Sequence, residues 1–410
     1  MTGPLITVEQ QLDRVLSAIT PLPAVRRRLA DAHGQVLAAD VRAAVDVPVF
    51  DNSAMDGFAV RFTDVAGATA EHPVMLAVVA DLPAGTDADP SLAPGQAARI
   101  MTGSPVPADA DAIVPFEDTV GGLDDSLATA VVTVAPAAAG RHIRRRGEDL
   151  SVGDVVLAAG TRLGALALGA VAATGVDEVE VVRRPRVAVV STGSELVPPG
   201  GALRHGQIPE SNSTLLAALA AEAGAEVVHV ESVPDEGDGP AEAIARARVH
   251  EPDVVVFSGG VSAGAYEAVK NSLGDVMTFS RVAMQPGKPQ GFGRTADGIL
   301  LFGLPGNPVS AAVSFEVFVR PALDALRGVS APRPVLRLAA AAGWRTPPGR
   351  RQYLPVVIDR SDPGAWRATP ATAGGSHLAG GLGRAEAYAI VPAEVDAVAA
   401  GDLVDVMLVT

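Results

Sequence analysis

The sequence predicts a multi-domain α/β protein: a central doubly wound α/β domain flanked by N-terminal mixed or β domains and by a small β-barrel-like C-terminal domain. Between residues 184 and 328, short apolar runs alternate with segments of helical periodicity, as in a parallel sheet covered by helices. On either side, short β-rich runs are separated by Gly, Pro and Asp, which is typical of small β domains. The length of 410 residues fits two to four domains at roughly 150 residues each.

The N-terminal part begins with a helix signal. Thr7 and Gln10 have the spacing of a capping box, and apolar residues with helical spacing continue to Ile19, where Pro21 and Pro23 follow. Strands are expected at 74–80, 97–101 and 130–134. We expect residues 1–50 and 143–183 to form an N-terminal linker domain, with 51–142 as an inserted small β domain.

The α/β part has the clearest pattern. Strands are expected at 187–190, 227–230, 254–257, 276–279 and 299–302; the first is a continuous apolar run, typical of a strand buried on both faces of a parallel sheet. Helices are expected from Asn212 or Ser213 to just before Gly224, from Asp238 and Pro240 through Val249, at 266–273, and from Pro308 to Gly328 with a bend at Pro321. These elements define an α/β domain at 184–328 and a C-terminal β domain at 329–410.

Composition excludes several classes of function. The chain has no cysteine, which excludes disulfides, thiolate metal sites and a Cys nucleophile. It has 32 basic and 47 acidic residues and a net charge of −15, which argues against nucleic acid or an anionic membrane as the main partner. No export signal or span of about 20 apolar residues is seen, so a soluble cytoplasmic protein is expected. The seven histidines lack metal-ligand spacing, so no zinc site is assigned.

Small polar residues follow three of the predicted strands, at the edge where open parallel sheets bind ligands. Each loop alone is more often an ordinary turn, but three at one sheet edge favour a ligand site. Glycine lets a ligand approach the backbone closely, the Ser and Thr hydroxyls can donate hydrogen bonds to it, and backbone N–H groups beside helix starts favour an anion. The expected ligand therefore bears phosphate. The candidate residues are Thr192, Gly193 and Ser194, then Ser258, Gly259, Gly260 and Ser262, then Gly306 and Asn307. No GxGxxG or GxxxxGK[ST] fingerprint is present, which argues against a conventional dinucleotide or P-loop enzyme.

Charged residues add to this site. Lys288 is one of two lysines and lies between prolines in Pro286-Gly287-Lys288-Pro289; a phosphate or oxyanion ligand and a solvated surface lysine are about equally expected. Glu195 follows a strand and is suited to Mg²⁺ beside substrate phosphates. The arginine run at 141–146 is either a solvated face or a local positive island for an anion.

Seven stretches together resemble one family, the MoeA-type molybdopterin molybdenumtransferases, related to the E domain of gephyrin. They are FDNSAMDGFAV (50–60), MTGSPVPADADAIVPFED (101–118), IRRRGEDLSVGD (143–154), STGSEL (191–196), SGGVS (258–262), PGKP (286–289) and LPGNPVS (304–310). The resemblance implies a homodimer in which 1–50 and 143–183 serve dimerisation. It also implies that the α/β domain binds adenylylated molybdopterin, and that N-terminal residues of the other subunit complete the site. The implied reaction inserts molybdate and releases AMP with Mg²⁺ assistance.

Site residues follow from the matching positions. The resemblance implies catalytic roles for Asp56, Asp149, Asp235 and Lys288, substrate contacts at Pro286 and Gly287, molybdate contacts at Arg350 and Ser376, and Mg²⁺ at Glu195 and Glu267. The chain departs from the family at Glu267 and Glu210, where Asp is usual, and at Arg281 and Gln285, where Lys is frequent.

Two other functions stay open at this point. One is the adenylyltransferase that makes the adenylylated substrate; the extra β domains argue against it. The other is a non-catalytic cofactor-binding or scaffold protein. The expected partners are the substrates, a second copy of the chain, the adenylyltransferase and the recipient molybdoenzymes.

Overall fold

The computed structural model describes residues 5–124, 127–235, 237–261, 268–371 and 379–409. The chain splits into two compact units: unit 1 comprises residues 1–25, 34–38 and 181–410, and unit 2 comprises residues 26–33 and 39–180. Each unit is described by itself. The expected glycine-rich strand ends and the PGKP segment all belong to unit 1. The four-part division at 1–50 with 143–183, 51–142, 184–328 and 329–410 stays a prediction.

Unit 1 contains a seven-stranded sheet in the order β1-β20-β22-β23-β19-β15-β18. The strands are β1 (Leu5–Ile6), β15 (Arg186–Thr192), β18 (Glu226–Val233), β19 (Val254–Ser258), β20 (Met277–Val282), β22 (Pro289–Arg294) and β23 (Leu300–Leu304). The four strands β18, β15, β19 and β23 are parallel, as expected. In contrast, β22 is antiparallel to both of its neighbours, so the sheet is mixed.

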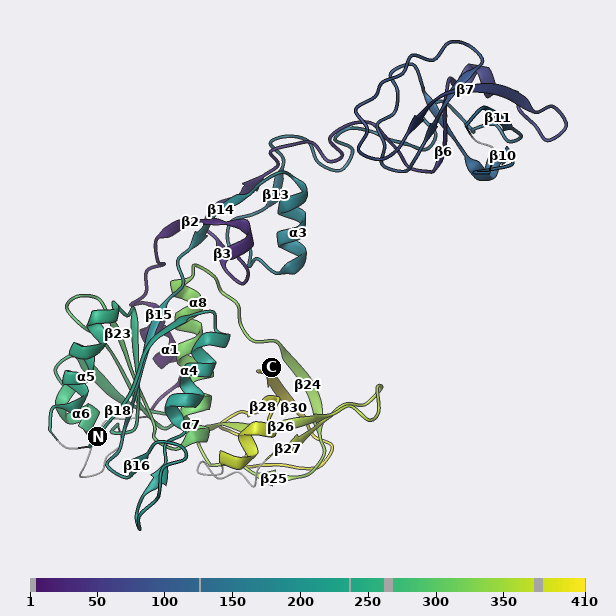
Figure 1. The fold of residues 1–410 in the computed structure, drawn as a ribbon. Helices are drawn as coiled ribbons and strands as arrows, with labels where there is room; N and C mark the ends of the chain where they lie inside the picture. The colour runs from purple at the N-terminus through teal and green to yellow at the C-terminus, as the bar shows by residue number, and fades with distance from the viewer. Residues whose placement is uncertain (1–4, 125–126, 236, 262–267, 372–378, 410) are drawn as a thin grey trace. The chain divides into compact units, whose positions relative to one another are not determined.

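Helices cover both faces of this sheet (Figure 1). On one face lie α4 (Asn212–Glu222), α7 (Pro308–Ser314) and α8 (Arg320–Leu326); on the other lie α5 (Gly239–Ala247) and α6 (Ala268–Leu273). Alternate residues of β15 enter two separate cores: Val187 and Val189 pack in one, Ala188 and Val190 in the other. Burial of both strand faces explains why β15 is a continuous apolar run.

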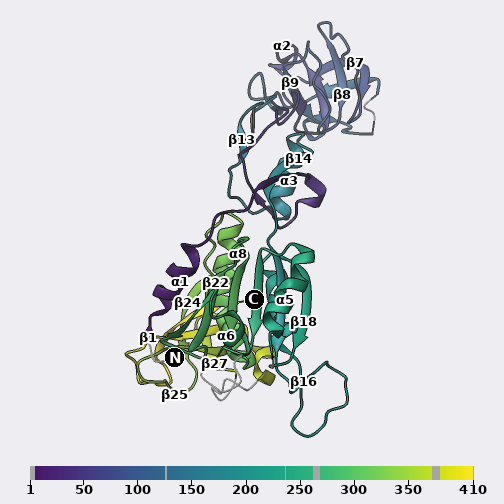
Figure 2. The same ribbon diagram turned by 90° about the vertical axis from the view of Figure 1, so that its left-hand side faces the viewer.

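The helix boundaries show which sequence signals were reliable. The capping box at Thr7 forms with both of its hydrogen bonds, and α1 (Val8–Leu16) follows it, beside α8 (Figure 2). The helix ends before the two prolines. At the end of α4, Gly224 adopts a left-handed φ of 81°, as the sequence predicts. The N-cap of α4 is Ser211, one residue before the expected position.

The helix predicted over 308–328 is interrupted just before Pro321. A π-helical segment, Phe315–Val319, separates α7 from α8. Proline has no N–H to donate to the preceding turn, which accounts for the break. After α5, a 3₁₀ turn, Arg248–His250, carries the chain beyond the expected end of that helix.

Strand β22, inside the seven-stranded sheet, is not predicted by the sequence pattern. Its sequence, PQGFGR, is rich in glycine and resembles a turn, yet the strand requires both glycines because neighbouring residues pack closely against them. A Cβ on Gly293 would lie 2.0 Å from the Val276 carbonyl oxygen, and one on Gly291 would lie 2.9 Å from the Phe279 ring. Glycine is therefore required at both positions because the neighbouring chain, at β20 and just before it, lies too close for a side chain. Because β22 is antiparallel to β23, it begins at the edge where β23 ends, which places the preceding PGKP segment there too.

The remainder of unit 1 is the predicted C-terminal barrel-like sheet. Its order is β21-β26-β27-β24-β30-β28, and β26 also pairs with β28, which closes five strands on themselves. The strands are β21 (Met284–Gln285), β24 (Val335–Ala340), β26 (Arg351–Asp359), β27 (Arg367–Pro370), β28 (Ala387–Val391) and β30 (Leu403–Leu408), with β25 (Trp344–Arg345) pairing with β29 (Ala397–Val398). Strand β21 joins this sheet directly before PGKP, so that segment is held by both sheets of unit 1.

Unit 2 is built around a six-stranded sheet, β10-β11-β7-β8-β6-β9. Its strands are β6 (Gly57–Val60), β7 (Val74–Leu82), β8 (Gln96–Ile100), β9 (Ala112–Pro115), β10 (Thr119–Val120) and β11 (Thr129–Val132). The expected strands at 74–80, 97–101 and 130–134 are therefore present to within two or three residues. The unit's other regular elements are α2 (Phe62–Val65), α3 (Ala165–Ala173) and the short pairs β4 (Val41–Arg42) with β13 (Val155–Leu157) and β5 (Asn52–Ser53) with β12 (Ile143–Arg144).

A three-stranded sheet contains β2 (Ala24–Arg28), β14 (Glu178–Val182) and β3 (Val36–Leu37). Across the residues that the structure describes, no helix has the length and apolar character that crossing a membrane requires.

Candidate functional site

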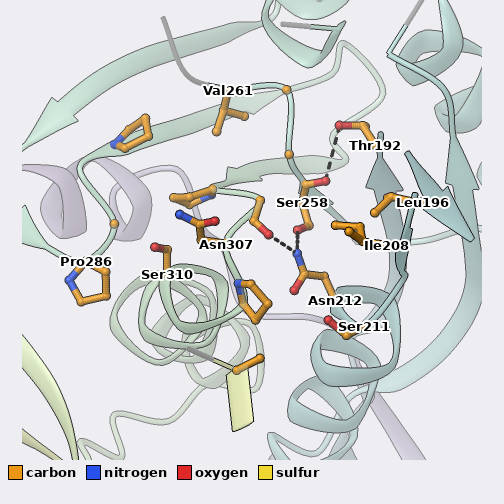
Figure 3. A pocket seen from close by; sticks show the side chains of 18 of the residues that line it. Thr192, Leu196, Ile208, Ser211, Asn212, Ser258, Val261, Pro286, Asn307 and Ser310 are labelled. Carbon is orange, nitrogen blue, oxygen red and sulfur yellow. Dashed lines mark hydrogen bonds between the residues drawn. The ribbon is translucent and has the colours of Figure 1, made fainter. Parts of the chain in front are cut away.

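A large pocket lies at the carboxyl edge of the parallel strands, with a cavity volume of about 870 Å³ (Figure 3). This size suits a ligand of nucleotide dimensions or larger. The pocket brings together most of the residues that the sequence singled out in unit 1: Thr192, Glu195, Asp235, Ser258, Gly259, Gly260, Pro286, Gly287, Lys288, Gly306, Asn307 and Arg350. Gly193 and Ser194 belong to the same loop as Thr192 and Glu195 but do not line the cavity. Ser262, Glu267 and Ser376 lie outside the described residues.

One side of the pocket, here the strand-end wall, is lined by Thr192, Glu195 and residues 258–260 and 305–307. These loops pack backbone against backbone. Gly259 has a φ of 95°, and a Cβ on it would lie 2.6 Å from the Thr192 carbonyl oxygen. Its amide donates to the Leu304 carbonyl at 3.0 Å. Glycine is therefore required here by both backbone conformation and space.

Two side chains tie these loops to the start of α4. Asn212 donates from Nδ2 to Ser258 Oγ and to the Gly306 carbonyl, at 2.6 Å each. Glu210 is buried and accepts from Ser191 Oγ and from the Ser213 amide at 2.8 Å each, as well as from the Ser213 hydroxyl. Because those contacts occupy its carboxylate, Glu210 acts as a structural brace for the helix start.

Asp235 and Ser194 bond each other reciprocally. The Ser194 amide donates to Asp235 Oδ2 at 3.3 Å, and the Asp235 amide donates to Ser194 Oγ at 3.2 Å. This pair joins the loop after β15 to the loop after β18 and holds the Asp235 carboxylate at the cavity. Glu195 is exposed and also lines the cavity. Within the described part of the chain, no group of three or more His, Asp or Glu side chains is arranged to hold a metal ion.

The opposite side, here the cation wall, consists of residues 285–289 and Arg350. Lys288 and Arg350 are half-buried, and none of the described residues forms an ion pair with either. Arg350 Nη1 donates to Gln285 Oε1 at 2.7 Å. Two positive side chains that form no ion pair with any described residue favour an anionic ligand, although Glu195 and Asp235 also line the cavity.

The PGKP loop of this wall is fixed from behind. Gln290, 1% exposed, donates from Nε2 to the Gly287 carbonyl and to Ser314 Oγ, at 2.7 Å each. Gly287 has a φ of 104°, and a Cβ there would lie 2.9 Å from Ser314 Oγ. The Lys288 carbonyl accepts from the Val282 amide at 2.7 Å. The loop is thus rigid at the backbone, while the lysine side chain reaches the cavity.

The predicted acidic residues of the N-terminal half lie in unit 2. Asp56 is exposed, and its Oδ1 accepts from the Thr102 amide at 2.6 Å; that hydrogen bond holds the pKa of the carboxyl below its usual value. Asp149 is exposed, and its amide donates to the Val47 carbonyl at 3.0 Å. Neither residue lines the pocket of unit 1.

The arginine run of unit 2 is partly neutralised. Arg145 pairs with Asp51 at 2.5 Å, and Arg146 pairs with Asp46. The pKa of both aspartates lies below the usual range. The main cause is a backbone hydrogen bond, from the Arg146 amide to Asp51 and from the Val152 amide to Asp46, and the paired arginine side chains lower the pKa further. The positive island expected at 141–146 is therefore weaker than its four arginines suggest.

Several lining residues were not predicted as site residues. They are Leu196, Ile208, Pro209, Glu210, Ser211, Asn212, Val261, Gln285, Pro289, Pro305, Pro308, Ser310 and Ala379. Asn212 was expected only as a helix cap, because nothing in its local sequence reveals its bonds to two distant loops. Leu196 and Ile208 lie on the short parallel pair β16 (Leu196–Val197) and β17 (Ile208–Pro209), whose two-residue strands carry no periodic signal.

Comparison with known proteins gives consistent matches along the chain. Three family models match: the MoeA N-terminal region (domains I and II) at residues 6–175, a probable molybdopterin-binding domain at 188–325, and the MoeA C-terminal region (domain IV) at 337–409.

Individual relatives agree with these family matches. The chain is 46% identical over 384 residues to molybdopterin molybdenumtransferase 2 of Mycobacterium tuberculosis, covering 91% of this chain and 92% of that protein. It is 36% identical over 424 residues to molybdopterin molybdenumtransferase 1 of the same organism, covering 98% of each. A crystal structure of a MoeA molybdopterin biosynthesis protein from Pyrococcus horikoshii superposes with a TM-score of 0.81 at 31% identity, covering 99% of each chain.

Proposed function

We propose that this chain, which belongs to the MoeA family, is a molybdopterin molybdenumtransferase acting in molybdenum cofactor biosynthesis. It inserts molybdate into adenylylated molybdopterin and releases AMP. The observation that carries the proposal is the pocket of unit 1, where Lys288 and Arg350 line the same cavity as the glycine- and hydroxyl-bearing strand ends and the carboxylates of Glu195 and Asp235. Adenylylated molybdopterin bears phosphates and molybdate is a dianion, so both substrates fit a site that presents Lys288 and Arg350.

The two walls suggest a division of roles. The strand-end wall offers the Ser258 hydroxyl and the Gly260 backbone as donors for the phosphates of the substrate, while the Thr192 hydroxyl donates to the Ser258 carbonyl at 3.5 Å. Lys288 neutralises charge that develops as the phosphoanhydride breaks, and Arg350 holds molybdate. The sulfur ligands of the metal belong to the substrate's dithiolene, so a chain without cysteine is suited to this reaction.

Mg²⁺ fits this site as an ion shared with the substrate. Glu195, with Glu267, would hold it, and when bound it would neutralise the phosphoanhydride. Mg²⁺ commonly binds through one or two carboxylates, waters and substrate phosphates.

We further propose that the active form is a cytoplasmic homodimer, in which Asp56 and Asp149 of one copy complete the pocket of the other. The family resemblance supports this arrangement. An ionised Asp56, kept so by the Thr102 amide, is suited to organising water near the substrate. The adenylyltransferase and the recipient molybdoenzymes are the proposed upstream and downstream partners.

The proposal is tested by supplying the purified chain with adenylylated molybdopterin, Mg²⁺ and molybdate. We expect AMP release together with active molybdenum cofactor, and loss of turnover in Asp235→Ala and Asp56→Ala with thermal unfolding unchanged. No AMP release by the wild type would refute the proposal. Consumption of ATP with free molybdopterin would instead identify an adenylyltransferase, and binding without turnover would identify a scaffold.

A further inference from the structure

The side chain of Asn212 connects three separate segments of the pocket. It is the first residue of α4, is 8% exposed, and lines the cavity. Its Nδ2 uses both hydrogens: one goes to Ser258 Oγ, at the end of β19, and the other to the Gly306 carbonyl, after β23 (Figure 3). The two acceptors are 46 and 94 residues away in the sequence.

We infer that Asn212 is a positioning residue that makes the Ser258 hydroxyl a hydrogen-bond donor to the phosphate of the bound nucleotide. This inference rests on the proposed function. A hydroxyl has one hydrogen and two acceptor positions. Because Asn212 occupies an acceptor position of Ser258, and none of the described residues accepts the Ser258 hydrogen, that hydrogen is available to the ligand. The second amide hydrogen fixes the Gly306 loop beside it.

Only a carboxamide performs both tasks here. An aspartate at position 212 would have the same shape but no hydrogen to donate when ionised. It would face the Gly306 carbonyl oxygen unfavourably and would accept the Ser258 hydrogen, which turns that hydrogen away from the ligand. A hydroxyl residue would supply only one hydrogen, so one of the two loops would lose its contact.

The other wall of the pocket uses the same device. Gln290 donates one amide hydrogen to a loop carbonyl, that of Gly287, and the other to a serine hydroxyl, that of Ser314. In each wall, therefore, one buried carboxamide links a glycine of a ligand loop to a serine. This parallel supports a positioning role for Asn212 beyond simple helix capping, since its backbone already lies within the helix.

The experiment measures AMP binding to the full chain by calorimetry at pH 8 and pH 5.5. We expect Asn212→Asp to weaken AMP binding by about tenfold or more at pH 8. The deficit relative to wild type should shrink at pH 5.5, because burial raises the pKa of a carboxyl; at the lower pH the introduced carboxyl is then partly protonated and can donate one hydrogen again. The matched control is Thr214→Ala on the exposed side of α4, which should bind AMP like the wild type.

A double-mutant cycle separates this role from simple stabilisation. Ser258→Ala should weaken AMP binding about as much as Asn212→Ala, and the double variant should be much less impaired than the product of the two effects. Wild-type affinity in Asn212→Asp, a deficit independent of pH, or fully additive losses would each overturn the inference. If Asn212→Asp fails to fold, Ser258→Ala and its pairing with Asn212→Ala still decide. Absence of AMP binding and AMP release in the wild type would instead refute the proposed function.

Discussion

The two walls of the pocket reach the same cavity by different structural routes. The strand-end wall follows directly from the parallel arrangement of β15, β19 and β23, whose carboxyl ends meet at one edge. The cation wall depends on β22 running antiparallel and on β21 pairing with β26 of the C-terminal sheet. One wall is thus a property of the α/β sheet alone, whereas the other also needs the C-terminal sheet.

The chemistry of the walls differs in the same way. The strand-end wall contributes hydroxyls, backbone groups and glycines held by Asn212 and Glu210. The cation wall contributes charge through Lys288 and Arg350. We interpret the first as the surface that orients the substrate and the second as the surface that neutralises it. The following predictions test this division from the largest expected effect to the smallest.

Removal of the lysine charge should have the largest effect. We expect Lys288→Met to lower kcat/KM for AMP release by about 100-fold or more, since loss of one preorganised electrostatic group typically costs that much. Stability against urea should hardly change, because no described residue pairs with this side chain. Lys288→Arg, the matched control, should retain more activity. Equal loss in both variants would show that the shape of the lysine, and not its charge, is what the site requires.

The amide behind the cation wall comes next. Gln290→Met should leave the Gly287 carbonyl and the Ser314 hydroxyl without this donor, so we expect unfolding free energy to fall by roughly 2–4 kcal/mol. AMP release should fall about tenfold, because the backbone that carries Lys288 becomes less ordered. Urea unfolding and single-turnover kinetics measure the two effects. Unchanged kinetics in a destabilised variant would limit Gln290 to a role in folding.

The same contrast explains how much the sequence could reveal. The loops at Thr192, Ser258 and Gly306 were predictable because they follow buried apolar strands, and a parallel sheet sets their common edge. Lys288 was visible as an unusual residue, but its place was not, because Gly291 and Gly293 hide β22 behind the appearance of a turn. The fold class could therefore be predicted, but the antiparallel edge could not.

Long-range side-chain contacts could not be predicted from the sequence, for a different reason. Asn212 and Gln290 act through partners that tertiary structure brings together, and nothing in the neighbouring sequence of either residue reports those partners. The same applies to the pairing of Arg145 with Asp51 and of Arg146 with Asp46. A count of charges could not show that these arginines are already neutralised, because the aspartates lie about a hundred positions away.

The departure from the family at Gln285 gives a smaller, sharper test of the cation wall. Gln285 accepts a hydrogen bond from Arg350, so a neutral acceptor orients the guanidinium. We expect Gln285→Leu to raise KM for molybdate about fivefold with little change in kcat, which is about the net value of one ordinary hydrogen bond, because the guanidinium that contacts molybdate stays in place. Gln285→Lys separates orientation from charge. If total positive charge decides the affinity for molybdate, Gln285→Lys should lower KM for molybdate. If the orientation of Arg350 decides, Gln285→Lys should raise that KM, and a raised KM is what we expect.

Salt dependence should show the smallest difference, and it compares the walls directly. Raising NaCl from about 0.05 to 0.5 M screens charges over distances of several ångströms, so AMP binding to the wild type should weaken. In Lys288→Met the loss over that range should be about threefold smaller, because one half-buried charge has been removed. Ser258→Ala should bind AMP more weakly at every concentration, yet with the wild-type dependence on salt, because a neutral hydroxyl is not screened. Calorimetric titrations at four salt concentrations measure these slopes. A shallower slope in Ser258→Ala, or an unchanged slope in Lys288→Met, would mean that orientation and neutralisation are not divided between the two walls.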